Sequence, residues 1–455
     1  MMRKTLIATA IAIPLFAANA HSSTPDVDKN IGSNGSLAAL TQSQTAVHSS
    51  VNVWLPELMT QFEQLPEVRA QKVLMKQTKL ALTSADNAIY NPELGLDYQN
   101  APGDDTYSIA VSQTIDWSDK RGEAVRVAQL ESEMVLASIE LNRSQLLSQQ
   151  LLALANLQQN QKLLAFNQQQ FDSAQRQLAL AKQRAEVGDI SMVELQLMQL
   201  DVANNAADLA IAEQEMLNAE TAVYGLLGPI LFSNPSQSAE VMTHNLLNID
   251  YLALAKIPSF QSVSPQLPAL KSAYQQVMLT KLTVNQMKAD LAEDPSISLS
   301  AEREGSDNKF AVGVSIPLQI RNNYSDAIAT ASEDISIAEQ AYLVEERLMQ
   351  QQWMQFNRAV PRLLQRYQQW EDLVQKSGQA ASSALSTQWR SGDIATSDYL
   401  QSQQQMSSSY IAGLRLEASL YENWLAWMGN SGQLEQILRE QLTSRDMTQS
   451  LKIAN

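Results

Sequence analysis

NPELGLDYQNAPGDDTYSIAVSQTI, residues 91–115, is the stretch from which the fold of this chain can be worked out. Its large apolar residues alternate with small or polar ones on both sides of a turn at 101–105; they are Leu94, Leu96, Tyr98, Tyr107, Ile109 and Val111. A period of two residues predicts a β-hairpin, over 93–116, with one apolar and one hydrophilic face. Asn91-Pro92 also ends the helix predicted from Leu65 to Ile89, because the residue before a proline is kept out of the helical region.

The same succession returns 203 residues later. Asp294-Pro295 ends a helix predicted from Pro268 to Ala292. A second alternating hairpin, over 296–318, has its turn at 304–308, and its apolar residues are Ile297, Leu299, Phe310, Val312, Val314, Ile316 and Leu318. Chance can repeat a short motif, but it does not repeat a helix stop and a hairpin in the same order. The chain therefore consists of two copies of one unit.

Each unit continues into a long helical hairpin. The first helix is predicted from about Arg121 to Val187, which would extend roughly 100 Å if it were continuous. It carries apolar residues at seven-residue steps, namely Leu157, Leu164, Phe171 and Leu178, a spacing typical of a coiled-coil seam. Gly188-Asp189-Ile190 forms the tip, and a return helix runs to about Leu227. In the second unit the helices run from about Tyr324 to Arg390 and from the tip Gly392-Asp393-Ile394 to Met428-Gly429.

These patterns divide the chain into six segments. Arg3-Lys4, an apolar run and Ala18-Asn19-Ala20 predict a cleaved secretory signal peptide, with an ordinary buried helix as the alternative. Residues 21–60 are rich in small polar residues and predict a flexible arm. The segments are a signal peptide at 1–20, the arm at 21–60, the first repeat at 61–228, a linker at 229–264, the second repeat at 265–429 and a C-terminal segment at 430–455.

Composition excludes several classes of function. The chain of 455 residues has a net charge of -16, no cysteine and three histidines. Such an acidic chain repels phosphate polymers, so we expect no nucleic-acid partner. The histidines lie far apart and no phosphate loop or H-E-x-x-H motif occurs, so we expect no enzyme, no cofactor and no metal site. The methionines are spread singly along helices, where packing is their ordinary use.

The four strands predict an assembly of several copies. A sheet in a membrane must close to satisfy its edge amides, and closed barrels begin at about eight strands. The apolar residues named above would then face lipid, and the small and polar residues between them would line water. A soluble sheet covered on one face is the competing interpretation. Helical hairpins of this length have no compact core, which favours a tube of helices coaxial with the barrel. The predicted fold class is mainly α with a small β part: duplicated helical hairpins forming a periplasmic α-barrel, and four strands per chain in a shared outer-membrane β-barrel.

With this layout the chain resembles the TolC-like outer membrane factor (outer membrane efflux protein) family over nearly its whole mature length. The stretches 91–97, 112–122 and 313–322 are similar to its heavy-metal, CzcC-like subgroup. The resemblance implies a homotrimer with a twelve-strand barrel in outer-membrane lipid and a periplasmic helical tunnel. It also implies a periplasmic adaptor and an inner-membrane RND pump as partners, with this chain as a passive exit duct for small solutes or heavy-metal cations.

The resemblance further implies that the hairpin tips close the tunnel and dock the adaptor. The tip residues are Arg184, Gly188, Asp189, Ile190, Ser191, Glu194, Arg390, Gly392, Asp393 and Ile394, and the aperture residues are Trp389, Asp398 and Gln401. Three copies of Asp398 could form a carboxylate ring that favours cations. The family has a second aperture carboxylate where this chain has Gln401. Capping of helix N-termini is the alternative role for the acidic residues at the tips.

The sequence is also compatible with two other functions. The same tunnel could serve as the exit duct of type I secretion. A periplasmic coiled-coil spacer without a pore is the structural alternative.

Overall fold

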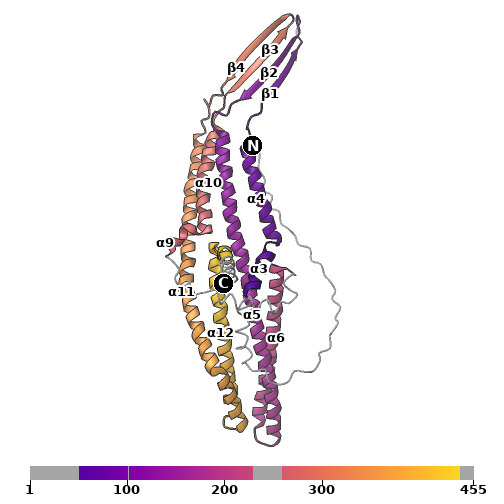
Figure 1. Cartoon of the computed structure of the whole chain (residues 1–455), viewed down its shortest axis with the longest axis vertical. Coiled ribbons are helices and arrows are strands. Elements are labelled where there is room, and N and C mark those ends of the chain that lie inside the picture. Colours follow the sequence, from indigo (N-terminus) through magenta and orange to yellow (C-terminus); the bar gives the residue numbers. More distant parts are fainter. Residues whose placement is uncertain (1–50, 101, 229–258, 441–455) are drawn as a thin grey trace, which may run out of the picture. The chain divides into compact units, whose positions relative to one another are not determined.

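The computed structural model describes residues 51–100, 102–228 and 259–440. Its elements, in chain order, are α3 (Val51–Phe62), α4 (Pro66–Ala85), β1 (Glu93–Gln99), β2 (Thr106–Thr114), α5 (Lys120–Glu186), α6 (Met192–Leu227), α9 (Phe260–Val263), η2 (Ser264–Gln266), α10 (Pro268–Leu291), β3 (Ser296–Glu304), β4 (Asp307–Ser315), α11 (Ser325–Ser391) and α12 (Thr396–Ser431). The predicted class, mainly helical with a small antiparallel sheet, is confirmed (Figure 1). The signal peptide, the arm to residue 50 and the linker to residue 258 lie outside the described residues.

Several predicted boundaries were wrong. The alternating run predicted to Leu318 ends as a strand at Ser315. Residues 51–60 of the predicted arm are helical in α3, because Leu58 and Phe62 are fully buried in the main core and secure the helix by packing. Helix α4 ends at Ala85, before Ile89. Helix α12 continues past Gly429 to Ser431, and a Cβ atom at Gly429 would meet the Ser148 side chain. That glycine therefore allows a close helix contact, while the chain reverses only at Gly432, where φ is +82°.

The sheet joins the two repeats. Its strand order is β1-β2-β3-β4, and every neighbouring pair is antiparallel. The central pair, β2 with β3, comes from different repeats and sets Val111 opposite Leu299. Strands β1 and β4 are the free edges of the sheet. No described helix carries an apolar stretch long enough to cross a membrane.

The helices pack in the same order as the strands. Nearer the strands, α4 packs on α5, α5 on α10 and α10 on α11. Nearer the tips, α6 packs on α5, α5 on α12 and α12 on α11. Within the described residues, neither α4 nor α6 makes an extended contact with α11, so these three helices each keep a free flank.

Among the helices, exposed apolar side chains are concentrated on those three. Large apolar residues with more than half of their surface exposed include Val73 and Leu80 on α4, Leu200 and Ile211 on α6, and Ile337 and Leu373 on α11. In the described part of the chain, α10 exposes only Tyr274 among large apolar residues, and α12 exposes none. The three helices with a free flank therefore expose apolar surface, whereas the helices packed on both sides expose little.

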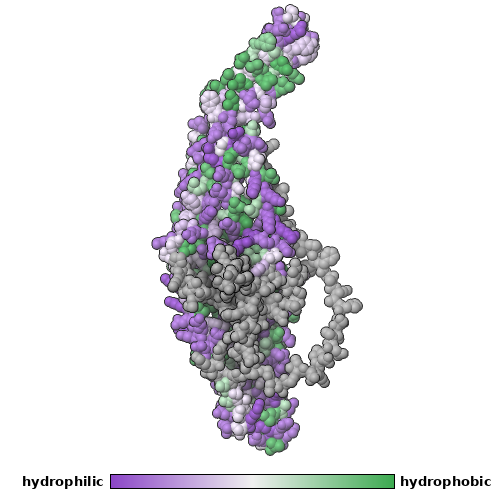
Figure 2. Space-filling model, in the orientation of Figure 1, coloured by the Kyte–Doolittle hydropathy of each residue, from purple (hydrophilic) through white to green (hydrophobic). Residues whose placement is uncertain are grey.

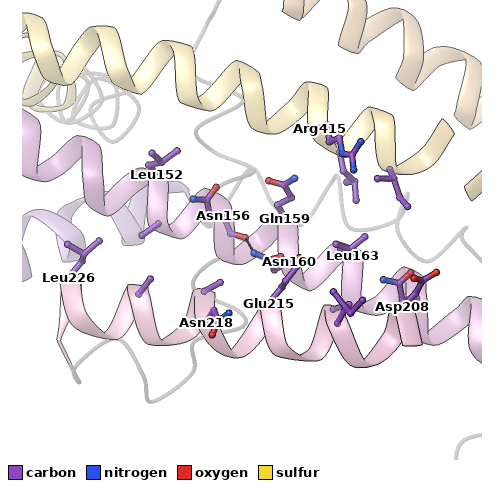
Figure 3. Close-up of a pocket in the computed structure, with 18 of the residues that line it drawn as sticks. Leu152, Asn156, Gln159, Asn160, Leu163, Asp208, Glu215, Asn218, Leu226 and Arg415 are labelled. Carbon is purple, nitrogen blue, oxygen red and sulfur yellow. Dashed lines mark hydrogen bonds between the residues drawn. The ribbon is translucent and has the colours of Figure 1, made fainter. Parts of the chain in front are cut away.

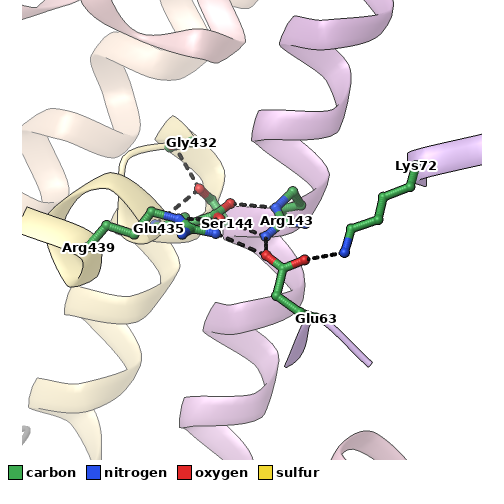
Figure 4. Close-up of polar contacts among 7 residues, drawn as sticks. All are labelled: Glu63, Lys72, Arg143, Ser144, Gly432, Glu435 and Arg439. Atoms are coloured by element: carbon green, nitrogen blue, oxygen red, sulfur yellow. Dashed lines mark hydrogen bonds and ion pairs between the residues drawn. The ribbon is translucent and has the colours of Figure 1, made fainter. Parts of the chain in front are cut away.

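The main core lies where α3, α5, α12 and the residues after α12 meet. Its fully buried members include Leu147 and Leu151 of α5, Trp424 of α12, and Leu434 and Leu438 beyond Gly432. Beside it, Arg143 of α5 binds two carboxylates, Glu63 and Glu435, and Arg439 binds the same pair (Figure 4). This ion network connects the start of the described chain to its end.

We expect Arg143→Met to destabilise the fold, because it leaves Glu63 and Glu435 without their buried cation. The Arg143 side chain is 10% exposed, so the loss should reach about 2 to 3 kcal/mol in the free energy of unfolding. Arg439→Met is the control, since that side chain is 52% exposed and its loss should cost under about 1 kcal/mol. Denaturant unfolding in detergent measures both, and equal losses would contradict the assignment.

The same network should make the free energy of unfolding depend on pH in the acidic range. Burial by itself raises the pKa of Glu63, but hydrogen bonds from Arg143 and Lys72 overcome it and hold the pKa at about 2. Because this lies below the ordinary value of about 4.3, the contribution is complete above about pH 5 and is lost as the pH falls toward 2. The Arg143→Met variant should show a smaller loss of stability over that range.

Candidate functional site

The first hairpin tip is built by a glycine turn and a capping box. Gly188 has φ of +79°, a conformation that side chains resist, so the chain can reverse there. Ser191 Oγ accepts the Glu194 N–H at 3.2 Å, and the Glu194 carboxylate accepts the Ser191 N–H at 2.8 Å. These bonds lower the pKa of Glu194, the backbone bond from Ser191 most of all. Capping is therefore the observed role of Glu194, and Asp189 forms an ion pair with Arg184.

The second tip has the same turn without the cap. Gly392 has φ of +81°, and Asp393 accepts a hydrogen bond from Ser391. At the position that matches Ser191, the N-cap of α12 is Ala395, which offers no side-chain hydrogen bond. Asp398, the counterpart of Glu194, is exposed and makes no hydrogen bond or ion pair to any residue of the described ranges. Its carboxylate is therefore not used for capping.

A small core joins the two tips. The Trp389 ring stacks on Tyr399 with centroids 5.1 Å apart, and its indole N–H donates to Thr396 Oγ1 at 3.2 Å. Thr396 in turn donates to Glu194 at 3.1 Å, and Arg184 donates to the Trp389 carbonyl at 2.8 Å. Trp389 is 1% exposed. Within one copy the Trp389 side chain therefore packs in this small core, and its role at the aperture stays a prediction.

The remaining tip residues divide into packed and exposed ones. Ile190 and Ile394 pack against the small core, one from each tip. The exposed residues are Gly188, Asp189, Ser191, Arg390, Gly392, Asp393, Asp398 and Gln401. The first tip also exposes three large apolar side chains, Val187, Met192 and Val193, at 80%, 67% and 65%. The predicted site residues thus lie together at the two tips, and an apolar patch accompanies them at the first.

Tyr399 is buried in the tip core, and beside it lies a partly buried titratable residue, Asp201, that the sequence pattern did not indicate. Burial and the charge of Asp201 raise the pKa of Tyr399 to about 12, and burial raises the pKa of Asp201. Their helical positions alone look like ordinary packing positions. Only the approach of α12 to α6 and α5 brings them together.

The sheet presents two chemically distinct faces. Residues that pair across it form rows, and one face holds the rows Leu94, Val111, Leu299, Val312 and Leu96, Ile109, Ala301, Phe310. The other face holds the rows Gly95, Ala110, Ser300, Ala311 and Glu93, Ser112, Ser298, Gly313. The predicted apolar and hydrophilic sets therefore do share one face each. Figure 2 shows the apolar residues as a green band over the strands, beyond which lie hydrophilic turn residues.

A buried carboxylate connects the sheet to the helices. Asp294, just before β3, accepts from the Tyr90 hydroxyl at 2.8 Å and from the Ser118 hydroxyl and the Ser118 and Trp117 backbone N–H groups at 2.9 to 3.2 Å. Lys120 Nζ lies 3.0 Å from it, and the Asp294 side chain is 2% exposed. Burial raises its pKa, but the bonds from Lys120, Tyr90 and Ser118 outweigh burial and hold the pKa at about 2. In the sequence Asp294 was recognised only as a helix stop.

A groove of about 950 Å³ lies between α5, α6 and α12 (Figure 3). Its walls combine amide and charged side chains, including Asn156, Asn218 and Arg415, with a similar number of Leu, Ile and Ala side chains. Such an open groove of mixed polarity differs from the enclosed, mostly apolar pockets that bury small ligands. In the described ranges, no group of three His, Cys, Asp or Glu side chains could hold a metal ion.

Comparison with known proteins supports the fold. Residues 64–229 match the sequence model of the outer membrane efflux protein family. The solved structures of similar fold include the VceC outer membrane protein of Vibrio cholerae (14% identity, 84% of this chain and 99% of that one, TM-score 0.66). They also include the CmeC outer membrane channel of Campylobacter jejuni (14%, 93% and 97%, 0.63) and the open-state MtrE outer membrane channel of Neisseria gonorrhoeae (12%, 83% and 89%, 0.65). No curated relative of similar sequence is found. This chain has the fold of outer-membrane efflux channels.

Proposed function

We propose that this chain is the outer-membrane channel subunit of a tripartite efflux system, and not an enzyme. Three copies would pool their strands into a twelve-strand barrel in outer-membrane lipid, above the minimum of about eight strands. Their helices would continue it as a periplasmic tunnel, reached after the signal peptide is cleaved. The efflux-family match over the first repeat and the channel fold support this assignment.

The proposal depends on one observation. Each helix with a free flank has a counterpart in the other repeat, and in that counterpart the equivalent flank is packed against a neighbouring helix. Helix α11 corresponds to α5, while α10 and α12 correspond to α4 and α6. The packed pair α5 with α10 therefore predicts a pair of α11 with α4 of the next copy, and α5 with α12 predicts α11 with α6 of the next copy. The apolar exposure of α4, α6 and α11 is what such closure would bury. Head-to-tail contacts of this kind generate rings.

The two tips are the proposed positions of the adaptor contact and of the aperture. The exposed Val187, Met192 and Val193 give a periplasmic adaptor an apolar patch on the first tip. Asp398 and Gln401 would line the aperture at the second tip, one pair from each copy. The energy for transport would come from an inner-membrane RND pump. Small solutes are the proposed cargo, with heavy-metal cations as the class that the motifs favour.

Purified protein tests the central claim. We expect a trimer that needs detergent and conducts ions in planar bilayers, because the apolar strand rows need lipid. A spacer without a pore would instead be soluble after lysis and would not conduct. Deletion should sensitise cells to some members of a panel of metal salts, dyes and detergents. Loss of polypeptide export with unchanged sensitivity would favour type I secretion instead.

Asp398→Ala should reduce the cation selectivity of single channels, because it removes one uncompensated carboxylate per copy from the aperture. Glu194→Ala is the matched control at the equivalent position, where the carboxylate is used for capping and its loss costs stability of about 1 kcal/mol. Reversal potentials in a salt gradient measure the selectivity. An unchanged reversal potential in Asp398→Ala would remove the residue from the aperture.

A further inference from the structure

The junction between β2 and β3 is a template for the contact between copies. This inference rests on the proposed function and adds the residues that meet. In the template Val111 lies opposite Leu299, and the Ile115 N–H donates to the Pro295 carbonyl at 2.9 Å. Moving 203 residues along the repeat converts the β2 side into β4 and the β3 side into β1. The free edge of β4 is thus the counterpart of the edge of β2 that pairs with β3.

We propose that β4 of one copy pairs with β1 of the next in this inherited register, which sets Val314 opposite Leu96 of the second copy. The neighbouring apolar pairs are then Val312 with Tyr98 and Ile316 with Leu94. Five of these six side chains lie on the apolar face, and Ile316 directly follows β4 with the same alternation, so the register continues the apolar band across the junction. The Leu318 N–H donates to the Pro92 carbonyl of the second copy, as Ile115 does to Pro295.

Within one copy, the residues after β4 already form the same backbone turn as the residues after β2. The Trp117 N–H donates to the Ile115 carbonyl at 2.8 Å, and the Ile320 N–H donates to the Leu318 carbonyl at 3.0 Å, although Leu318 has no strand beside it in one copy. Each turn then leads to a non-glycine residue with positive φ, Asp119 at 57° or Tyr324 at 56°, directly before a long helix. The free edge therefore repeats the turn and the helix start of the occupied one, with two additional residues between them.

A paired change of charge supports the same contact. In the template, Asp294 forms an ion pair with Lys120, the first residue of α5. The counterpart of Asp294 is Asn91, at the offset of 203. The counterpart of Lys120 as first residue of the long helix is Ser325, because two additional residues before α11 increase the offset to 205. Both members have lost their charge, whereas a change in only one would leave a buried ion unpaired. Asn91 and Ser325 lie at opposite edges of one copy, so they can meet only between copies. The junction between copies is accordingly neutral where the internal junction is ionic.

Disulfide cross-linking tests the register, and the chain has no cysteine of its own. Residues directly opposite each other in antiparallel strands lie within disulfide reach. The double variant Val314→Cys with Leu96→Cys should give covalent dimers and trimers on oxidation. Val314→Cys with Leu94→Cys, displaced by two residues, is the matched control and should give none. Val111→Cys with Leu299→Cys should oxidise within one copy and keep the monomer mass.

The cross-linking results distinguish a failure of the proposed register from a failure of the proposed function. A detergent-stable trimer that cross-links through Leu94 but not through Leu96 would overturn the register and leave the channel intact. A monomer with no cross-link between copies would overturn both.

A charge transplant gives a second measurement. Asn91→Asp should lower the temperature at which the trimer dissociates, because it places an unpaired carboxylate in the junction. Adding Ser325→Lys should restore it at least to the original value, because the internal ion pair is then reproduced between copies. A double variant no more stable than Asn91→Asp would contradict the contact.

Discussion

Val312→Arg is expected to prevent stable insertion into the outer membrane. Val312 is 74% exposed and lies in an apolar row with Leu299, Val111 and Leu94. An arginine facing lipid near the bilayer midplane costs about 2 to 4 kcal/mol, and a trimer would incur that cost once in each copy. Membrane fractionation and the yield of detergent-stable trimer measure the effect.

Ala311→Arg is the matched control for Val312→Arg. It makes a comparable change one residue earlier in β4, on the face that carries Ser300 and Ala110. We expect this variant to insert and assemble, because that face would line water. Its conductance should fall, since each copy places a guanidinium in the lumen. If the two variants inserted equally well, the assignment of the two faces would be wrong.

Asp294→Ala should destabilise the junction of sheet and helices by about 3 to 5 kcal/mol, because it leaves Lys120 as a buried, unpaired cation. It also removes the acceptor of the hydrogen bonds from Tyr90, Trp117 and Ser118. Thermal unfolding measures the loss, and faster proteolysis between β2 and α5 should accompany it.

Asp294→Asn and a double variant refine that result. Asp294→Asn keeps one acceptor oxygen for these donors and should lose less stability than Asp294→Ala. Combining Asp294→Ala with Lys120→Met removes the unpaired charge and should recover part of the loss. If Asp294→Ala unfolded like the original protein, the carboxylate would not connect the repeats.

The elements of the fold were predictable because each depends on neighbours along the chain. Alternation at Leu94, Leu96 and Tyr98 indicates a strand whatever lies beside it, and Pro92 and Pro295 prevent a helix from continuing through them, although α4 already ends at Ala85. The tip glycines and the capping box of Ser191 with Glu194 are equally local. The arm was misjudged from residue 51 onward, because α3 depends on burial of Leu58 and Phe62 against residues distant in the chain.

Some features of the site likewise depend on residues nearby in the sequence, and others depend on residues distant in the sequence. The position of the tips follows from periodicity, and the family resemblance implies that they form the site. Periodicity does not distinguish Asp398 from Glu194, which occupy equivalent first turns. Only the packed tips show that Glu194 is used for capping, that Asp398 is not, and that Trp389 is enclosed. The use of Asp294 in binding Lys120 likewise depends on strands from two repeats meeting.

Sequence patterns thus establish the strands, the helices, the duplication and the reversals, since dihedral preferences and side-chain periods act over a few residues. The choice of neighbours belongs to the tertiary structure: β2 beside β3, α5 between α10 and α12, and free flanks on α4, α6 and α11. Burial and hydrogen bonding between distant segments are properties of packed surfaces, and they appear only when those surfaces meet.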